Sequence, residues 1–194
     1  MVPAETPSLS EGSSCPSLTT LLGGATAIAA ISTLTLPWQI AIASTTLGAF
    51  MIAGADVDAR TYLLPDAVTW GAVASGLVAA LALNPSNPAL GLEAAVARAI
   101  GTAVVLMLLR WSHGYLRGHE GLGLGDVKLS AAVGAWLPLE FISLCFSIAA
   151  IGALINVVLS GFRGRSVSRS TKIPFGAFLC PALWLVYYMS VLIY

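Results

Sequence analysis

Charged side chains are scarce in this chain. Only 9% of its 194 residues are Asp, Glu, Lys or Arg, whereas a soluble domain has about 25%. The formal net charge is zero, so the sequence has neither the basic surface typical of nucleic-acid-binding proteins nor an acidic tail. This scarcity argues against a soluble domain and against a nucleic-acid partner.

Cysteine and histidine are also rare in this chain. Cys15, Cys145 and Cys180 are scattered and form no CxxC pair, which argues against a disulfide scaffold or a zinc site. No apolar run precedes Cys15, so a lipoprotein site is not indicated. His113 and His119 lie six positions apart in a polar connection and are a weak metal-binding pair. We therefore expect no metal and no cofactor.

Long uncharged stretches dominate what remains. Hydrophobic residues make up 57% of the chain, and a helix needs about 20 apolar residues to cross a bilayer. Since backbone facing lipid must satisfy its own hydrogen bonds, these stretches should be helices. We predict an all-α, polytopic transmembrane helical bundle with six to seven helices, at about 19–36, 39–56, 67–83, 94–110, 127–137, 140–160 and 174–193. The count stays open because segment 127–137 is too short to cross alone, and it is expected to form a half-helix.

The predicted spans form a single membrane-embedded domain over residues 19–194. Residues 1–18 are rich in Ser and Pro and are expected to form a flexible tail. The basic residues lie in or beside three connections, near 57–66, 110–127 and 161–173, which should therefore share the cytoplasmic face. Arg98 is an exception within the fourth span, and we expect it to snorkel outward or to meet Glu93.

Two acidic residues lie eight positions apart after the second predicted span. Asp66 follows Pro65, which suits the first turn of a helix because its missing N–H needs no partner there. Asp66 therefore has a structural explanation, since the positive end of a helix stabilises a carboxylate. Asp58 has none, because it ends an apolar span and has no capping role. An ionisable group at a membrane boundary is costly, which favours a functional role over that of a solvated loop charge.

A glycine-rich segment precedes the fifth predicted span, with the sequence Glu120-Gly121-Leu122-Gly123-Leu124-Gly125-Asp126-Val127-Lys128-Leu129. Alternate glycines permit close backbone approach and positive φ. No strand precedes them and the G-x-G-x-x-G spacing is absent, so a dinucleotide site is not indicated. By itself the segment is also typical of a turn that leads into a helix, with Asp126 as its N-cap.

Together these features resemble the type IV prepilin peptidases, which are membrane aspartic proteases of the GxGD class. That family has an Asp eight residues before the Asp of a Leu-Pro-Asp, and a distant Gly-x-Gly-Asp-x-Lys-Leu. Here Asp58 stands eight residues before the last residue of Leu64-Pro65-Asp66, and residues 123–129 supply the second motif. Ile173-Pro174-Phe175-Gly176 matches the family's late Pro-Phe-Gly turn. The resemblance covers about residues 50–180.

The resemblance implies an aspartic endopeptidase of the cytoplasmic (inner) membrane, with its active site at the cytoplasmic membrane boundary. Its substrates would be the short basic leaders of type IV prepilin, pseudopilin or Flp-type pilin precursors. Asp58 and Asp126 would be the catalytic pair, with the eight-residue spacing selecting Asp58 over Asp56. The implied supporting or substrate-binding residues are Lys128, Asp66, Glu120, Gly123, Gly125 and Pro65. Lys128 would favour an ionised Asp126 and thus Asp126 as the base.

One departure from the family concerns its N-terminal part. Many members begin with a cytoplasmic domain that has two CxxC pairs and is associated with methylation, and this sequence contains no CxxC. It therefore resembles a compact, peptidase-only branch.

Two other functions stay open. An archaeal-type preflagellin peptidase or a broader GxGD intramembrane protease would use the same acids. A small proton-coupled transporter would use membrane carboxylates as a relay, although these acids lie at predicted helix ends and no inverted repeat is evident. A non-enzymatic assembly protein is a further alternative, but both acids are intact.

Overall fold

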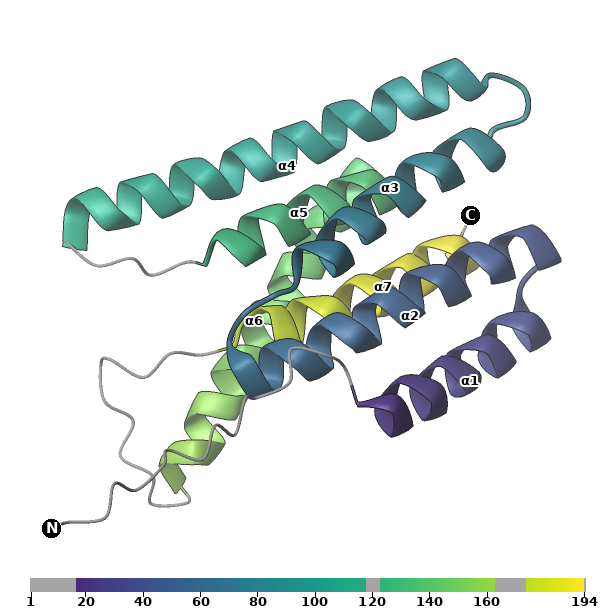
Figure 1. The fold of residues 1–194 in the computed structure, drawn as a ribbon. Helices are drawn as coiled ribbons and strands as arrows, with labels where there is room; N and C mark the ends of the chain where they lie inside the picture. The colour runs from purple at the N-terminus through teal and green to yellow at the C-terminus, as the bar shows by residue number, and fades with distance from the viewer. Residues whose placement is uncertain (1–16, 118–122, 163–173, 194) are drawn as a thin grey trace, which may run out of the picture.

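The computed structural model describes residues 17–117, 123–162 and 174–193, and these residues form seven helices and no strand (Figure 1). The helices are α1 (Leu18–Thr35), α2 (Trp38–Thr61), α3 (Asp66–Ala82), α4 (Pro88–Arg117), α5 (Leu124–Trp136), α6 (Leu139–Phe162) and α7 (Gly176–Ile193). The sequence predicted all seven segments. The predicted tail lies almost wholly outside the described residues, so its flexibility stays a prediction.

The largest differences from the predicted boundaries concern α2 and α4. Helix α2 was expected to end near residue 56 but continues to Thr61, which places Asp58 inside the helix rather than after it. Helix α4 was expected over 94–110 and instead runs from Pro88 to Arg117. Both extensions carry polar residues beyond the apolar run. A helix can continue there because its backbone hydrogen bonds form within the helix itself, inside or outside the membrane.

Five of these helices are long and apolar enough to cross a membrane: α1, α2, α4, α6 and α7. Helix α3 is apolar but has only 17 residues. Helix α5 has 13 residues, or about 20 Å at 1.5 Å per residue, against a hydrocarbon core of about 30 Å. The protein is thus an all-α, multi-pass membrane protein, and α5 is the half-length helix that the sequence predicted.

Helix α5 is enclosed by its neighbours. It packs between α3 and α4 and also contacts α6 and α7. Leu129, Ala132 and Val133 on this helix are fully buried. Helix α1 lies at the opposite edge of the bundle from α4, against α2 (Figure 1). A short helix can therefore sit deep in the membrane protein, because other helices rather than lipid surround it.

Hydrogen bonds between helices fix how they pack. The Trp136 indole N–H donates to the carbonyl oxygen of Ala72 at 2.8 Å, which joins α5 to α3. The Thr102 hydroxyl lies 2.8 Å from the carbonyl oxygen of Ser130, between α4 and α5. Arg98 Nε donates to the carbonyl oxygen of Gly134 at 3.2 Å, a partner that the sequence did not predict, while its outward snorkelling stays a prediction. Polar contacts of this kind hold transmembrane helices in register.

Several helix ends lie towards the same end of the bundle (Figure 1). There α2, α4 and α6 end, and α3, α5 and α7 begin. We call it the Asp58 end, because Asp58 lies in the last turn of α2. These helix ends flank, in the sequence, the three basic connections predicted above.

Candidate active site

Asp58 is a buried acid that faces the start of α7. Its side chain is 5% exposed, and its Oδ2 accepts a hydrogen bond from the backbone N–H of Ala177 at 2.7 Å. Ala177 is the second residue of α7, so this N–H has no carbonyl partner inside the helix. The positive N-terminal end of α7 therefore stabilises the ionised form of Asp58.

Asp126 lies in the first turn of α5, and Gly123 rather than Asp126 is the N-cap. The alternative explanation of Asp126 as an N-cap does not hold. Its carboxyl turns back towards Gly123. Burial and then the nearby charge of Asp58 raise the pKa of Asp126 to about 6, while the backbone of Gly123 opposes this shift. Two acids 68 positions apart in the sequence thus lie close enough to influence each other's ionisation.

Leu64 lies against the start of α5, which carries Asp126, and the start of α7, which donates a hydrogen bond to Asp58. A Cβ built on Gly125, next to Asp126, would come within 3.0 Å of the Leu64 Cβ. A Cβ on Gly176, next to Ala177, would come within 2.5 Å of Leu64 Cδ1 and 2.9 Å of Asp58 Oδ2. The glycines thus permit close approach rather than positive φ. Glycine at both positions lets the α2–α3 connection fit against α5 and α7.

The outer part of the site contains an ion pair. Lys128 Nζ binds Asp66 Oδ1 at 2.5 Å, and Asp66 lies in the first turn of α3, directly after Pro65 as its N-cap. The side chain of Asp66 is 67% exposed, and such a pair contributes little stability by itself. Lys128 is thus placed on Asp66, whereas the sequence led us to expect that it would act on Asp126.

Asp56 faces away from this site. It forms an ion pair with Arg60 one turn later on α2, and it accepts a hydrogen bond from the Ser17 backbone N–H at 2.7 Å. Residues that are two positions apart on a helix point in directions about 200° apart around its axis. Asp56 and Asp58 therefore point to different neighbours, and the choice of Asp58 over Asp56 as the catalytic acid stays a prediction.

Some expectations concern residues that the structure does not describe. Glu120 and His119 lie outside the described ranges. Within the described ranges, no three His, Cys, Asp or Glu side chains come together as a metal site would require. The roles of Leu64 and Ala177 were missed at the sequence level. Leu64 was quoted only as part of a motif, and the motif Pro174-Phe175-Gly176 pointed to the start of α7 without indicating a role for it.

Sequence comparisons relate the chain to known proteins. Residues 45–159 match the type IV leader peptidase family. The chain belongs to that family. It is 36% identical over 154 residues to a prepilin leader peptidase/N-methyltransferase of Xanthomonas campestris pv. campestris, covering 78% of this chain and 50% of the relative. It is 38% identical over 160 residues to a protein of the same name from Burkholderia pseudomallei (strain 1026b), covering 82% and 50%.

The chain spans about half the length of the curated relatives that it matches. No solved structure gives a significant match. The family was thus predicted correctly from the sequence, on the motifs that contain Asp58 and Asp126.

Proposed function

We propose that this chain is an aspartic endopeptidase that removes the short basic leader from type IV prepilin-like or Flp-type pilin precursors. The observation that supports this best is the meeting of Asp58 and Asp126 at the Asp58 end, within a chain of the type IV leader peptidase family. Relatives named prepilin leader peptidase support the substrate class. We place the site at the cytoplasmic face of the inner membrane, because the helix ends around it flank the basic connections in the sequence.

Two neighbouring carboxyls suit peptide hydrolysis because they resist double ionisation and so retain one proton. The Ala177 N–H favours an ionised Asp58 against the effect of its burial, and the raised pKa of Asp126 favours its protonated form. Asp58 then takes a proton from the attacking water, and Asp126 donates a hydrogen bond to the scissile carbonyl. These roles are the reverse of those expected from the sequence, where the nearby Lys128 suggested that Asp126 is the base. The proton on Asp58 then passes to the leaving amine.

The test is cleavage of a prepilin-like peptide by the purified protein in detergent. Asp58→Asn and Asp126→Asn are expected to abolish cleavage while leaving the protein folded. Asp56→Asn is the matched control, because Asp56 lies two residues from Asp58 on the same helix but pairs with Arg60. Wild-type turnover by either of the first two variants would remove that acid from the mechanism.

The same carboxylates would serve a proton-coupled transporter. Their position in the last turn of α2 and the first turn of α5 suits a rim site better than a relay across the bilayer. Proton flux into proteoliposomes without any substrate would favour the transporter. Cleavage of archaeal preflagellin leaders or of whole transmembrane substrates in preference to prepilin leaders would favour the other peptidase branches.

A further inference from the structure

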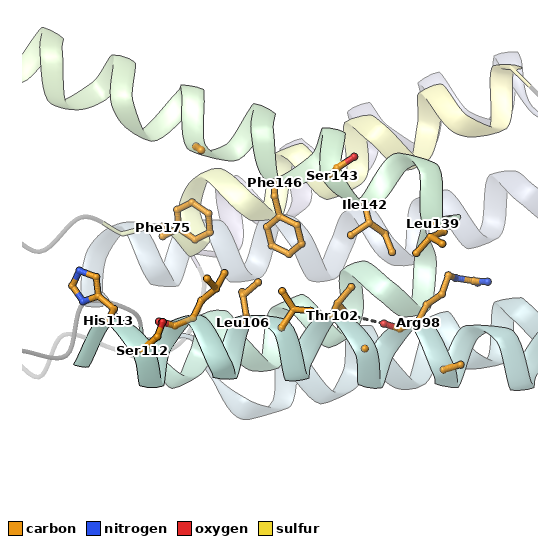
Figure 2. Close-up of a pocket in the computed structure, with 15 residues that line it drawn as sticks. Arg98, Thr102, Leu106, Ser112, His113, Leu139, Ile142, Ser143, Phe146 and Phe175 are labelled. Atoms are coloured by element: carbon orange, nitrogen blue, oxygen red, sulfur yellow. Dashed lines mark hydrogen bonds between the residues drawn. The ribbon is translucent and has the colours of Figure 1, made fainter. Parts of the chain in front are cut away.

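An open groove of about 1140 Å³ lies between α4 and α6 (Figure 2). Each helix turns one regular face towards it: every third or fourth residue of α4 from Ala97 to His113, and of α6 from Leu139 to Ala150. Most of these side chains are apolar, including Leu106, Ile142 and Phe146. The groove is therefore a surface for an apolar ligand.

The dimensions of the groove suit a membrane helix. The stretch of α4 that lines it has a length of about 24 Å at 1.5 Å per residue, compared with about 30 Å for the hydrocarbon core. Small residues such as Gly101 and Ala150 leave space for the close approach that helices in membranes prefer. A single face of a helix would fit along this length.

One end of the groove adjoins the two acids. Phe175 lines the groove, and the next two residues, Gly176 and Ala177, contact the Asp58 carboxylate. A chain that lies in the groove and continues past Phe175 would therefore reach Asp58. Figure 2 shows Phe175 and His113 towards the same end of the groove.

At this end of the groove, His113 has a buried nitrogen atom that needs a hydrogen-bond partner. Among the described residues, its Nδ1 is one of two buried side-chain nitrogen or oxygen atoms without a hydrogen-bond partner. Leaving such an atom unpaired is costly. An extended peptide offers backbone N–H and C=O groups that can pair with it, whereas the acyl chain of a lipid offers neither.

We propose that the substrate has an apolar helix directly after its leader and that the groove binds this helix, with the scissile bond beyond Phe175 and the polar backbone at the helix start paired with His113. This inference rests on the proposed function. It states that the enzyme recognises two parts of its substrate, the leader junction at the acids and the following helix between α4 and α6.

Gly101 allows a direct test. A Cβ on Gly101 meets nothing within 4 Å, and Gly101 lines the groove, so Gly101→Trp is designed to place a large side chain in the groove. Gly23 on α1 is equally open and lies off the groove, so Gly23→Trp is the matched control. Two peptides are compared: one carries a leader and an apolar helix of about 20 residues, and the other ends shortly after the leader junction.

Gly101→Trp is expected to lower the ratio of kcat/KM for the helix-bearing peptide to that for the short peptide by about tenfold or more, because apolar contacts with the helix are lost. Gly23→Trp is expected to keep the wild-type ratio. A wild-type ratio in Gly101→Trp, or an equal loss on both peptides, overturns the inference.

Photocrosslinking tests the occupant without requiring turnover. A photoreactive residue is placed at Leu109, which lines the groove, or at Leu108, which does not; their side chains are 57% and 56% exposed. Asp126→Asn protein is mixed with the helix-bearing peptide in lipid vesicles. An adduct with the peptide from position 109 but not from 108 supports the inference, whereas an adduct with lipid alone or with a second copy of the chain overturns it. If the wild-type protein cleaves neither peptide, the proposed function fails, and the crosslink still decides what the groove binds.

Discussion

The position of Asp58 depends on a residue 118 positions later in the chain. A Cβ on Gly176 would lie 2.9 Å from Asp58 Oδ2 and 3.1 Å from its Cγ. This is closer than the atoms can pack, so any side chain at 176 must displace the carboxyl or the start of α7. The hydrogen bond from Ala177 to Asp58 requires the same close approach.

We therefore expect Gly176→Ala to lower kcat by about a hundredfold, because a displacement of about 1 Å is enough to disturb a catalytic group to this extent. Gly114→Ala on α4 is the control, since a Cβ on Gly114 meets nothing within 4 Å. The measurement is the rate of cleavage of a prepilin-like peptide under saturating conditions. Full activity of Gly176→Ala would show that the contact between α7 and Asp58 has no catalytic role.

At this scale the sequence singled out Asp58 and Asp126 as a pair but did not indicate the residues that contact them. Asp58 and Asp126 each lie in a short motif with fixed spacing, and such a motif can be found from the amino-acid sequence alone. The contact of Leu64 with both helix starts arises from packing between segments far apart in the chain, and no local pattern encodes it. Lys128 was misjudged for the same reason, because its partner Asp66 belongs to another helix.

At the scale of helices, α4 and α5 approach each other closely near Gly134. A Cβ on Gly134 would lie 2.3 Å from the carbonyl oxygen of Arg98 and 2.5 Å from the Thr102 hydroxyl. The backbones of α4 and α5 approach here as small residues allow in membrane bundles. Since α5 carries Asp126, this contact also supports the site.

Gly134→Ala is expected to destabilise the protein by about 1–3 kcal/mol, because the added methyl group forces α4 and α5 apart. The measurement is thermal unfolding in detergent, with Gly101→Ala on the open face of α4 as the control. An unfolding temperature for Gly134→Ala equal to that of the wild-type protein would contradict the packing described here.

The helices themselves could be predicted because each is an apolar stretch punctuated by proline or by polar residues. Pro37, Pro65, Pro138 and Pro174 all lie within two residues before a helix start. Helix ends in polar segments could not be placed this way, as the longer α2 and α4 show. The bond from Arg98 Nε to the Gly134 carbonyl could not be predicted either, because its partner lies on another helix and only packing brings the two together.

For the whole molecule, membrane orientation determines which substrates can reach the acids. The α2–α3 connection lies at the Asp58 end and the α3–α4 turn at the other (Figure 1). We expect Leu63→Cys, on the first, to face the cytoplasm, and Ser86→Cys, on the second, to face outwards. Both positions are exposed.

A membrane-impermeant maleimide should therefore label Ser86→Cys in intact spheroplasts and Leu63→Cys only after lysis. Both variants are made in a Cys15→Ser background, and Cys145 and Cys180 are buried. The opposite labelling pattern would place the acids on the outer face, and a basic leader held in the cytoplasm could not reach them.

The central claim is that Asp58 and Asp126 act as one catalytic unit. Residues that act as a unit give non-additive losses when they are removed together. The most direct measurement is the rate of leader cleavage by Asp58→Asn, Asp126→Asn and the double variant under the same conditions. We predict that all three fall to the same residual rate. A double variant whose loss equals the product of the two single losses would show that the acids act independently and would contradict the account.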